Sequence, residues 1–499
     1  MAHRHVLAID QGTTSTRVLA FDVHGRAAGR ARRELPQHYP SPGWVEHDPE
    51  DIWRDTHACL TEVLAASDAS GAQAEALGIT NQRETTLLWD RSTGVPLHRA
   101  IVWQDRRTAP LCQRLKAQGA EDLVRAKTGL LLDPYFSATK LAWLLENLPG
   151  ARARALRGEL AFGTVDSFLL WRLTGGRVHA TDVTNAARTL LYDIRAQCWD
   201  AELLRLFDVP AALLPEVRDN SGLFGSTEPR LFGRALPITG IAGDQQAALI
   251  GQACFAPGSV KSTYGTGCFL LLNTGTAPAA AAAGLLTTPA YRLGGEIRYA
   301  IEGSIFVAGA AIQWLRDRLK VIDSAAASAA LAAGVADDHG VYLVPAFVGL
   351  GAPYWRPDAR GLICGLTFQT SAAQLARAAL ESVAYQTLDL LAAAQQHAAS
   401  PVQALRVDGG MAANDWFCQF LADLLDVPVE RPAELETTAR GAAFLAGLAT
   451  GVWASQEALA AIWTQERLFA PQMAPSRRAA LLAGWRDAIA RTLLCPPPG

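Results

Sequence analysis

An apolar strand that runs directly into a turn of glycine and hydroxyl residues opens the chain. Residues 6–9 (VLAI) are followed by Asp10, the turn sequence QGTTST at 11–16, and a second apolar run at 18–21. This pattern predicts a β-hairpin whose tip is rich in hydroxyls and backbone amides. A continuous apolar run is typical of a strand that is buried on both faces.

A second strand–turn–strand pattern lies near the middle of the chain. Residues 260–273 (VKSTYGTGCFLLLN) place a Gly/Thr turn between two strand-like runs. The layout is similar to that of the first hairpin. It predicts a weak internal duplication, in which each of two lobes carries a phosphate-type hairpin. The similarity is too faint to indicate a solenoid.

Further strands and helices alternate along the chain. Residues 76–80, 238–242 and 405–408 read as strands, each followed by polar or glycine residues. Helices are expected from Asp48 to about residue 66 and over the alanine-rich residues 324–333. This alternation predicts an α/β protein.

Composition excludes several classes of function. The 499 residues are 50% apolar and 19% charged, so a sizeable core can be buried. The 45 Lys and Arg against 48 Asp and Glu give a net charge of −3, which argues against a nucleic-acid partner. Eight cysteines without a C-x-x-C pair indicate neither a disulfide framework nor a zinc knuckle. Without a signal peptide or a long apolar run, a cytoplasmic protein with no membrane span is expected.

The turns contain groups that can bind phosphate or a nucleotide. Gly12 lets the backbone approach a ligand closely, and the amides and hydroxyls of residues 13–15 can cradle phosphate oxygens. Asp10 can hold Mg²⁺ as a hard oxygen ligand, directly or through water. The glycines at 264–267 and 408–410 can also approach an anion or a base. An ordinary polar turn is the alternative for each.

Polar residues between the hairpins form a candidate site for a small polyol. The adjacent Arg83 and Glu84 follow a predicted strand, and such a pair can donate to one hydroxyl and accept from another. Trp103 and Tyr135 can form an apolar wall against a carbon chain. Asp244 begins a predicted helix and can act as a general base. A surface ion pair, core aromatics and a helix N-cap are the simpler alternatives.

Two common nucleotide-binding motifs are absent from the sequence. It contains no G-x-x-x-x-G-K-[ST], and no G-x-G-x-x-G follows a strand with a fitting acid downstream. Neither a P-loop protein nor a dinucleotide-dependent enzyme is therefore supported.

Seven blocks of the sequence resemble the FGGY carbohydrate kinases, in matching order from the first hairpin to about residue 450. They are DQGTTSTR (10–17), GITNQRET (78–85), YFSATKLAW (135–143), GIAGDQQAALIGQ (240–252), STYGTGCF (262–269), GLTFQTSAAQLARAALES (365–382) and LRVDGGMAAND (405–415). Among the family's members, NQRET (81–85) and GWVEHDP (43–49) are similar to those that phosphorylate glycerol.

The resemblance implies an α/β protein with the two-lobed, actin-like fold of the sugar-kinase ATPases, built of ribonuclease H-like domains around a central cleft. Residues 1–249 would form the N-terminal lobe with the glycerol site and phosphate hairpin, and residues 250–499 the nucleotide-binding lobe. The implied reaction is the in-line, ATP-dependent phosphorylation of glycerol to sn-glycerol 3-phosphate in glycerol catabolism, with Mg²⁺ as cofactor. A homodimer or homotetramer is expected.

The resemblance also assigns individual residues. Those expected to face the ATP phosphates are Thr13, Thr14, Ser15 and Arg17. Those expected to line the nucleotide site of the second lobe are Thr266, Gly309, Gln313, Gly410 and Asn414. Those expected to hold glycerol are Arg83, Glu84, Trp103, Tyr135, Asp244, Gln245 and Phe269. Asp244 would be the general base, and Asp10 would position Mg²⁺ through water.

Two alternative functions stay open. One is an FGGY kinase for another polyol or sugar, such as xylulose or gluconate, and the other is a non-catalytic actin-like nucleotide switch. The Arg83–Glu84 pair favours glycerol.

A loop that ends in Gly-Thr-Arg makes some members of the family sensitive to fructose 1,6-bisphosphate. The equivalent residues 228–237 are one residue shorter and place Ala235 at the arginine position. Weak inhibition by fructose 1,6-bisphosphate is therefore expected.

Overall fold

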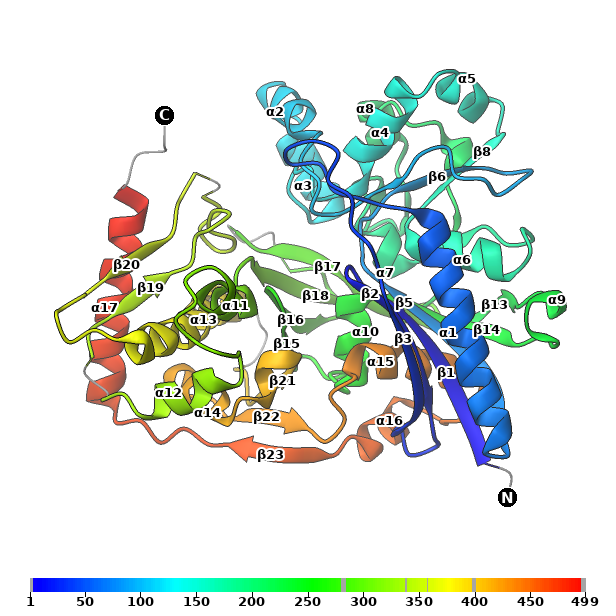
Figure 1. Cartoon of the computed structure of the whole chain (residues 1–499). Helices are drawn as coiled ribbons and strands as arrows, with labels where there is room; N and C mark the ends of the chain where they lie inside the picture. The colour runs from blue at the N-terminus through cyan, green and yellow to red at the C-terminus, as the bar shows by residue number, and fades with distance from the viewer. Residues whose placement is uncertain (1–2, 280–283, 337–338, 357, 397–400, 495–499) are drawn as a thin grey trace.

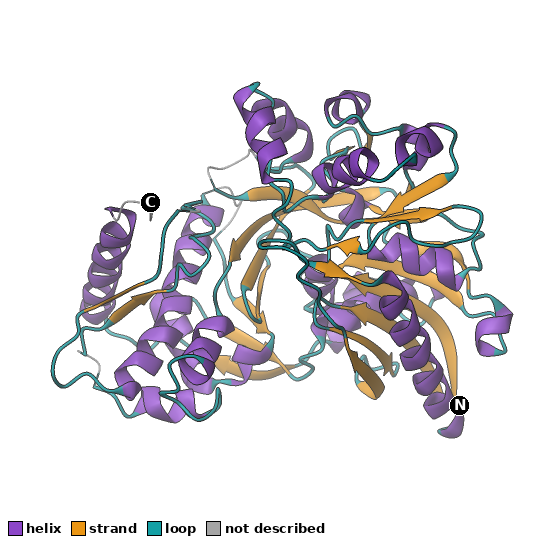
Figure 2. Cartoon of the chain, turned by 45° about the horizontal axis from the view of Figure 1, so that its top comes forward, coloured by secondary structure: helices purple, strands orange, loops and turns teal. Residues whose placement is uncertain are grey.

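Two mixed β-sheets surrounded by helices make up the protein (Figures 1 and 2). The computed structural model describes residues 3–279, 284–336, 339–356, 358–396 and 401–494. The first sheet has the order β13-β14-β5-β1-β2-β3. Its strands are β1 (His3–Gln11), β2 (Ser15–Phe21), β3 (Ala27–Glu34), β5 (Ala72–Asn81), β13 (Ser221–Ser226) and β14 (Pro237–Gly243).

The second sheet is built entirely from the later part of the chain. Its order is β17-β18-β16-β15-β21-β22-β23. Its strands are β15 (Val260–Tyr264), β16 (Cys268–Gly275), β17 (Leu286–Leu293), β18 (Glu296–Ile305), β21 (Leu405–Asp408), β22 (Val429–Pro432) and β23 (Gln465–Phe469).

The two sheets repeat one arrangement of strands. In the first, β1, β5 and β14 are parallel neighbours, β2 and β3 continue antiparallel on one side, and β13 closes the other. In the second, β15, β21 and β22 are parallel, followed by β16 and β18 on one side and β23 on the other. The similarity predicted for the two hairpins thus extends to six strands of the same order and direction.

The first hairpin has the structure that the sequence predicts. β1 and β2 are antiparallel, with Asp10 opposite Arg17. The Gly12 amide donates to the Ser15 carbonyl at 2.9 Å and closes the turn. The four residues of the apolar run at 6–9 are all buried. Side chains alternate between the faces of a strand, so Leu7 and Ile9 enter a different core from Val6 and Ala8.

Helix α1 (Pro49–Ala69) covers one of these faces. Its N-cap is Asp48, whose carboxylate accepts a hydrogen bond from the Glu50 amide, as the acidic start of the predicted helix indicates. The buried stripe of α1 includes Ile52, Leu60 and Val63, which join Leu7 and Ile9 in one core.

Helix α15 (Thr437–Thr450) covers the other face, although it comes from the end of the chain. It also packs on α10 (Asp244–Gly251), and Figure 1 shows the two helices between the sheets. A Cβ at Gly441 would lie 1.8 Å from the Ala247 carbonyl oxygen, and a Cβ at Gly78 of β5 would lie 2.2 Å from the Ala442 carbonyl oxygen. Glycine therefore lets the backbones of α15, α10 and the sheet touch.

The remaining elements surround this frame, and α2–α5 and α8 form a separate layer at the top of Figure 1. The other helices of the first half are α2 (Ala109–Ala117), α3 (Glu121–Thr128), α4 (Ser137–Asn147), α5 (Ala151–Leu156), α6 (Val165–Leu173), α7 (Val183–Ala186), α8 (Ala201–Leu206) and α9 (Pro229–Phe232). The other helices of the second half are α11 (Gly309–Asp317), α12 (Ala327–Ala333), α13 (Ala372–Gln395), α14 (Asp415–Leu425), α16 (Gln456–Ile462) and α17 (Pro475–Leu494). The short strands are β4 (Glu46–His47), β6 (Leu87–Asp90), β7 (Ala100–Ile101), β8 (Leu160–Gly163), β9 (Ala180–Asp182), β10 (Tyr192–Asp193), β11 (Cys198–Trp199), β12 (Glu216–Arg218), β19 (Tyr342–Val344) and β20 (Leu362–Cys364).

Two of the sequence predictions need adjustment. Helix α1 extends three residues beyond the predicted end at 66. The helix predicted over 324–333 begins only at Ala327, and the Ala327 amide donates to the Ser324 hydroxyl at 3.2 Å in the turn that precedes it. Across the described ranges, none of the helices combines the length and apolarity needed to cross a bilayer.

Candidate functional site

Polar residues meet at the carboxyl edge of the first sheet. The parallel strands β1, β5 and β14 are in register there, with Asn81 opposite both Gln11 and Gly243. The segments that follow these three positions therefore leave the sheet at the same level. Ligands of α/β sheets bind at the carboxyl ends of the strands, so this edge is a candidate binding site.

Arg83 and Glu84 are buried at this edge, with exposed fractions of 3% and 1%. The alternative of a surface ion pair is therefore wrong. The Arg83 Nε lies 3.1 Å from Asp244 Oδ1 and 4.0 Å from Glu84 Oε1. A Cβ at Gly243 would lie 2.7 Å from Arg83 Cγ and Cδ, so the glycine makes room for the arginine beside Asp244.

Asp244 is the first residue of α10, and Gly243 occupies the N-cap position. The N-cap alternative for Asp244 is therefore wrong. Its Oδ1 accepts from the Gln245 amide at 2.7 Å, and 29% of its side chain stays exposed. Burial of the carboxyl group raises the pKa of Asp244 to about 6, although Arg83 opposes this shift. A carboxylate with a raised pKa and a free face has the properties of a general base.

Trp103 and Tyr135, the two aromatic residues expected to form an apolar wall, are in ring contact, and Phe269 lies beside Trp103. The ring centroid of Trp103 lies 5.6 Å from that of Tyr135 and 6.5 Å from that of Phe269, and both pairs have edge-to-face geometry. The Trp103 Nε1 donates to the Thr13 hydroxyl at 2.9 Å. The predicted polyol wall and the predicted phosphate turn are thus in direct contact.

Two buried lysines that the sequence patterns did not single out support these residues. Lys140 donates to the carbonyl oxygens of residues 134, 135 and 136 at 2.6–3.0 Å and so fixes the backbone that carries Tyr135. Lys261 of β15 donates to Gln245 Oε1 at 2.6 Å and links the second sheet to α10. Burial lowers the pKa of Lys261. In a chain whose basic residues are mostly arginines, the lysine at position 261, within a predicted strand, was the sequence feature that could have indicated this role.

A second group of predicted residues meets at the carboxyl edge of the second sheet. The parallel strands β15 and β21 place Thr263 opposite Asp408. The Gly309 amide at the start of α11 donates to the Gly265 carbonyl at 3.0 Å, and the Thr266 carbonyl accepts from the amides of the two residues that flank Gly309. The turn at 264–267 and the start of α11 therefore form one continuous surface.

The Gly409–Gly410 turn adjoins this surface. Gly409 has a φ of +85°, and a Cβ there would lie 2.5 Å from the Tyr264 carbonyl oxygen, so glycine is required. A Cβ at Gly410 would meet no atom within 4 Å, so open space lies above the turn. Asn414 caps α14 by accepting from the Phe417 amide at 3.0 Å, which fixes its side chain. Gln313 is exposed on α11.

The first hairpin places Arg17 between two carboxylates. Arg17 bonds to Asp10 and donates to Glu436 Oε2 at 2.6 Å, and Asp10 is 2% exposed. Thr14 is exposed at the tip of the hairpin, whereas Ser15 is largely buried.

Among the described residues, no three His, Cys, Asp or Glu side chains are grouped to hold a metal ion. A single carboxylate beside the turn that is predicted to bind phosphate would suit a metal bound through water and held mainly by phosphate oxygens.

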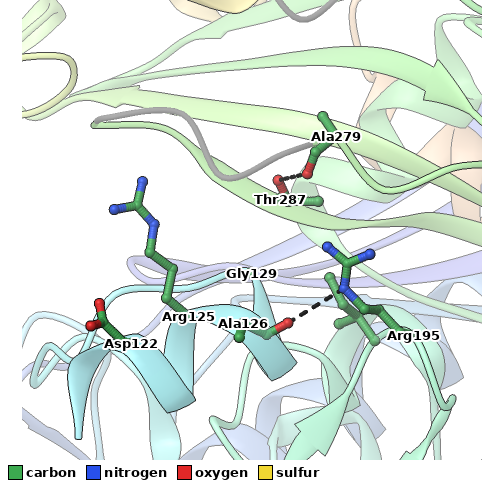
Figure 3. A pocket seen from close by; sticks show the side chains of 8 residues that line it. Asp122, Arg125, Ala126, Gly129, Arg195, Ala279 and Thr287 are labelled. Atoms are coloured by element: carbon green, nitrogen blue, oxygen red, sulfur yellow. Dashed lines mark hydrogen bonds between the residues drawn. The ribbon is translucent and has the colours of Figure 1, made fainter. Parts of the chain in front are cut away.

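A separate cavity of about 310 Å³ lies between α3 and β17 (Figure 3). Asp122, Arg125, Arg195 and Thr287 are among the residues that line it. None of the predicted site residues lines this cavity, so it is distinct from the candidate site.

Comparison with known proteins agrees with this geometry. Family models described as the N-terminal and C-terminal domains of the FGGY family of carbohydrate kinases match residues 5–251 and 260–450. The chain is 61% identical to a glycerol kinase of Rhodospirillum centenum over 98% of both chains. It is 62% identical to a glycerol kinase of Methylobacterium nodulans over 99% of both.

Solved structures show the same fold. The crystal structure of Plasmodium falciparum glycerol kinase with ADP has a TM-score of 0.93, 36% identity and 99% coverage of both chains. A gluconate kinase of Lactobacillus acidophilus, at 21% identity, has a TM-score of 0.86 with 98% coverage of both. The two-lobed α/β fold of the sugar kinases is thus confirmed, and the chain belongs to the FGGY family of carbohydrate kinases.

Proposed function

We propose that this protein phosphorylates glycerol with ATP to give sn-glycerol 3-phosphate and ADP. One observation carries the proposal: Arg83, Glu84 and Asp244 form a buried polar group beside an aromatic wall that touches the phosphate turn. Such a site has donors and acceptors for adjacent hydroxyls and an apolar side for a short carbon chain. The names of the full-length relatives also support glycerol as the substrate.

The nucleotide is proposed to lie between the two carboxyl edges. Its phosphates would face Thr13, Thr14, Ser15 and Arg17, and its nucleoside would lie against Thr266, Gly309, Gln313, Gly410 and Asn414. The open space above Gly410 and the joined turns at Gly265 and Gly409 suit a flat ligand. Asp10 would hold Mg²⁺ through water, and the metal would supply positive charge to offset that of the phosphates.

Asp244 is proposed to accept the proton of the attacking glycerol hydroxyl. Its carboxylate is ionised above a pKa of about 6 and keeps one face free, while Arg83 holds the other in place. Gln245 and Phe269 would complete the glycerol site. Gln245 is oriented by Lys261, and Phe269 lies 5.9 Å from the Arg83 guanidinium.

We also propose that residues 1–249 and 250–499 form the two lobes, with α15 returning to the first sheet as its cover. Assembly as a homodimer or homotetramer stays a prediction.

Acceptor-dependent ADP release tests the proposed function. ATP turnover is measured with glycerol, dihydroxyacetone, xylulose and gluconate, and without any acceptor. We expect the highest kcat/KM for glycerol, together with a phosphorylated product. A higher kcat/KM for another acceptor would make the protein a different FGGY kinase. Turnover that does not depend on any acceptor would indicate a nucleotide switch.

A further inference from the structure

We propose that Arg188 and Glu302 are positioning residues that set the orientation of Arg83 and Glu84 and so determine the affinity for the polyol. This inference rests on the proposed function. Arg188 follows α7 in the first half of the chain, and Glu302 lies in β18 of the second sheet. Both side chains are fully buried, with exposed fractions of 0% and 1%.

Glu302 holds the outer end of the Arg83 side chain. Its two carboxylate oxygens accept from both terminal nitrogens of Arg83, at 2.5 Å and 3.0 Å. This paired contact fixes the plane of the guanidinium as well as its position. Because Nε of the same group faces Asp244, the plane that Glu302 sets also places the contact between Arg83 and the proposed base.

Arg188 connects Glu302 to the second polyol residue. Its Nε donates to Glu84 Oε1 at 2.6 Å and its Nη2 to Glu302 Oε1 at 2.9 Å. Its guanidinium also lies 5.6 Å from the ring centroid of Tyr135. Arg188 thus contacts two of the groups proposed to surround the polyol, Glu84 and Tyr135, and links them to Glu302.

Glu84 needs this support because its backbone is strained. Its φ of +63° lies in the left-handed region, which residues other than glycine rarely adopt. Its carbonyl oxygen accepts from the hydroxyls of Thr86 and Ser137, both at 3.0 Å. Strained backbone persists where surrounding contacts over-determine it, and at functional sites the strain aims a side chain. The backbone contacts hold the main chain of Glu84, and Arg188 holds its carboxylate.

The four residues form a charge-balanced cluster of two arginines and two glutamates. Burial alone would raise the pKa of Glu302, but Arg188 and Arg83 lower it to about 2, so the carboxylate is ionised. Removing one charge would leave another buried without a partner, which is costly for the fold. Removing Arg188 and Glu302 together leaves Arg83 and Glu84 in balance. The double variant therefore separates positioning from simple loss of charge balance.

The main test compares two double variants. Arg188→Gln/Glu302→Gln removes the supporting pair. Arg377→Gln/Glu381→Gln is the matched control, because it removes a buried ion pair of 2.7 Å within α13, a different element from those that carry the cluster. We expect the KM for glycerol to rise about tenfold or more in the first variant, since small misplacements of binding groups are costly. The KM for ATP of the first variant should stay within about twofold of the KM for ATP of the control variant.

The outcomes separate this inference from the proposed function. A wild-type protein without glycerol kinase activity would reject both. An active wild-type protein whose double variant keeps its KM for glycerol within twofold would reject the inference alone. An equal rise in the KM values for glycerol and ATP would also reject it, because that pattern indicates a general structural role.

A single conservative variant decides the matter if the double variant does not fold. Arg188→Lys keeps the positive charge but cannot reach Glu84 and Glu302 through one planar group. We expect its KM for glycerol to rise with little change in the melting temperature or in the KM for ATP. An unchanged KM for glycerol in this variant would overturn the positioning role.

Discussion

Asp244 combines two properties that are in tension. Its carboxyl group is partly buried beside Arg83. The burial raises its pKa and the arginine lowers it, and burial has the larger effect, so the pKa is raised to about 6. An ordinary aspartate, with a pKa of 3.8, would be a weaker base. The raised pKa suits proton transfer near neutral pH and defines the pH range in which the site can work.

The activity should therefore depend on pH through Asp244. The ionised form accepts the proton, so kcat/KM for glycerol should be constant well above pH 6 and fall about tenfold per pH unit below it. Initial rates between pH 5 and 9 at saturating ATP would measure this profile. A profile that is flat down to pH 5 would contradict the assignment.

The variant Asp244→Asn tests the same role of Asp244 as a general base. Its amide cannot accept the proton, so we expect kcat to fall by about 10²–10⁴-fold while glycerol still binds. Because the folded state binds the Asp244 proton more tightly than the unfolded state, the wild-type protein loses stability as the pH rises from about 4 to about 6. The variant lacks this loss, so its melting temperature at pH 7.5 should not fall. Near-wild-type turnover would remove Asp244 from the base role.

Sequence patterns singled out the residues now proposed to contact the ligands, but not the residues that hold those side chains in place. Arg83, Glu84 and Asp244 follow directly after apolar strands, which is a local signal. Glu302 lies within a strand, 219 positions from Arg83, and Arg188 lies 104 positions from Glu84. Such pairings depend on how the sheets pack together, which one sequence does not reveal.

At the scale of elements, the short helix α7 ties two strand ends together. The Thr184 hydroxyl accepts from the Gly243 amide at 2.9 Å, directly before Asp244. Asn185 and Asn81 exchange two amide hydrogen bonds at 3.0 and 3.1 Å, two residues before Arg83. Asp182, the N-cap of α7, accepts from the amides of both Thr184 and Asn185. Helix α7 therefore sets the relative position of Asp244 and Arg83.

Thr184→Val should affect both stability and catalysis. The change keeps the shape of the side chain but leaves the buried Gly243 amide without its acceptor, a loss of about 1–3 kcal/mol. We expect a lower melting temperature and a reduced kcat/KM for glycerol. Thr174→Val is the control, because Thr174 is equally buried and accepts from the Val178 amide away from the site. If both variants lose the same activity per degree of destabilisation, α7 has no special role.

The major elements followed from the sequence more readily than the minor ones. Both hairpins, α1 and the start of α10 were predicted, because long apolar runs and capping residues mark them. Helix α7 has only four residues and is stabilised by hydrogen bonds to the Asp182 carboxylate. It is too short to show a periodic pattern of apolar residues in the sequence.

On the scale of the whole molecule, the site is assembled from distant parts of the chain. Arg17 contacts Glu436 across 419 positions, and Lys261 reaches from the second sheet to Gln245. Glu302 adds a second connection from the second sheet. The composition and the net charge of −3 gave no hint of this concentration of charge, because it is internal and nearly balanced.

The close contact of α15 with α10 should make Gly441 intolerant of any side chain. In Gly441→Ala the new methyl group would lie 1.8 Å from the Ala247 carbonyl oxygen, so the two helices must separate. Overpacking of this kind costs about 1–3 kcal/mol or more. We expect a clear drop in the melting temperature by calorimetry. Gly334→Ala, whose new Cβ would meet no atom closer than 3.6 Å, is the control. Equal melting temperatures for the two variants would contradict the close packing.

The position of α15 in the chain also affects how the protein is made. The face of the first sheet that contains Val6, Ala8 and Ala76 is complete once β14 has been synthesised, but its main cover, α15, begins only at Thr437. At roughly 5–20 residues per second, a ribosome needs about 10–40 seconds to bridge that interval. During this time α10, which follows β14 directly, can pack against this face through Ala247 and Ile250, but α15 has not yet been made. The cover of this face is therefore completed only after most of the second half of the chain has been synthesised.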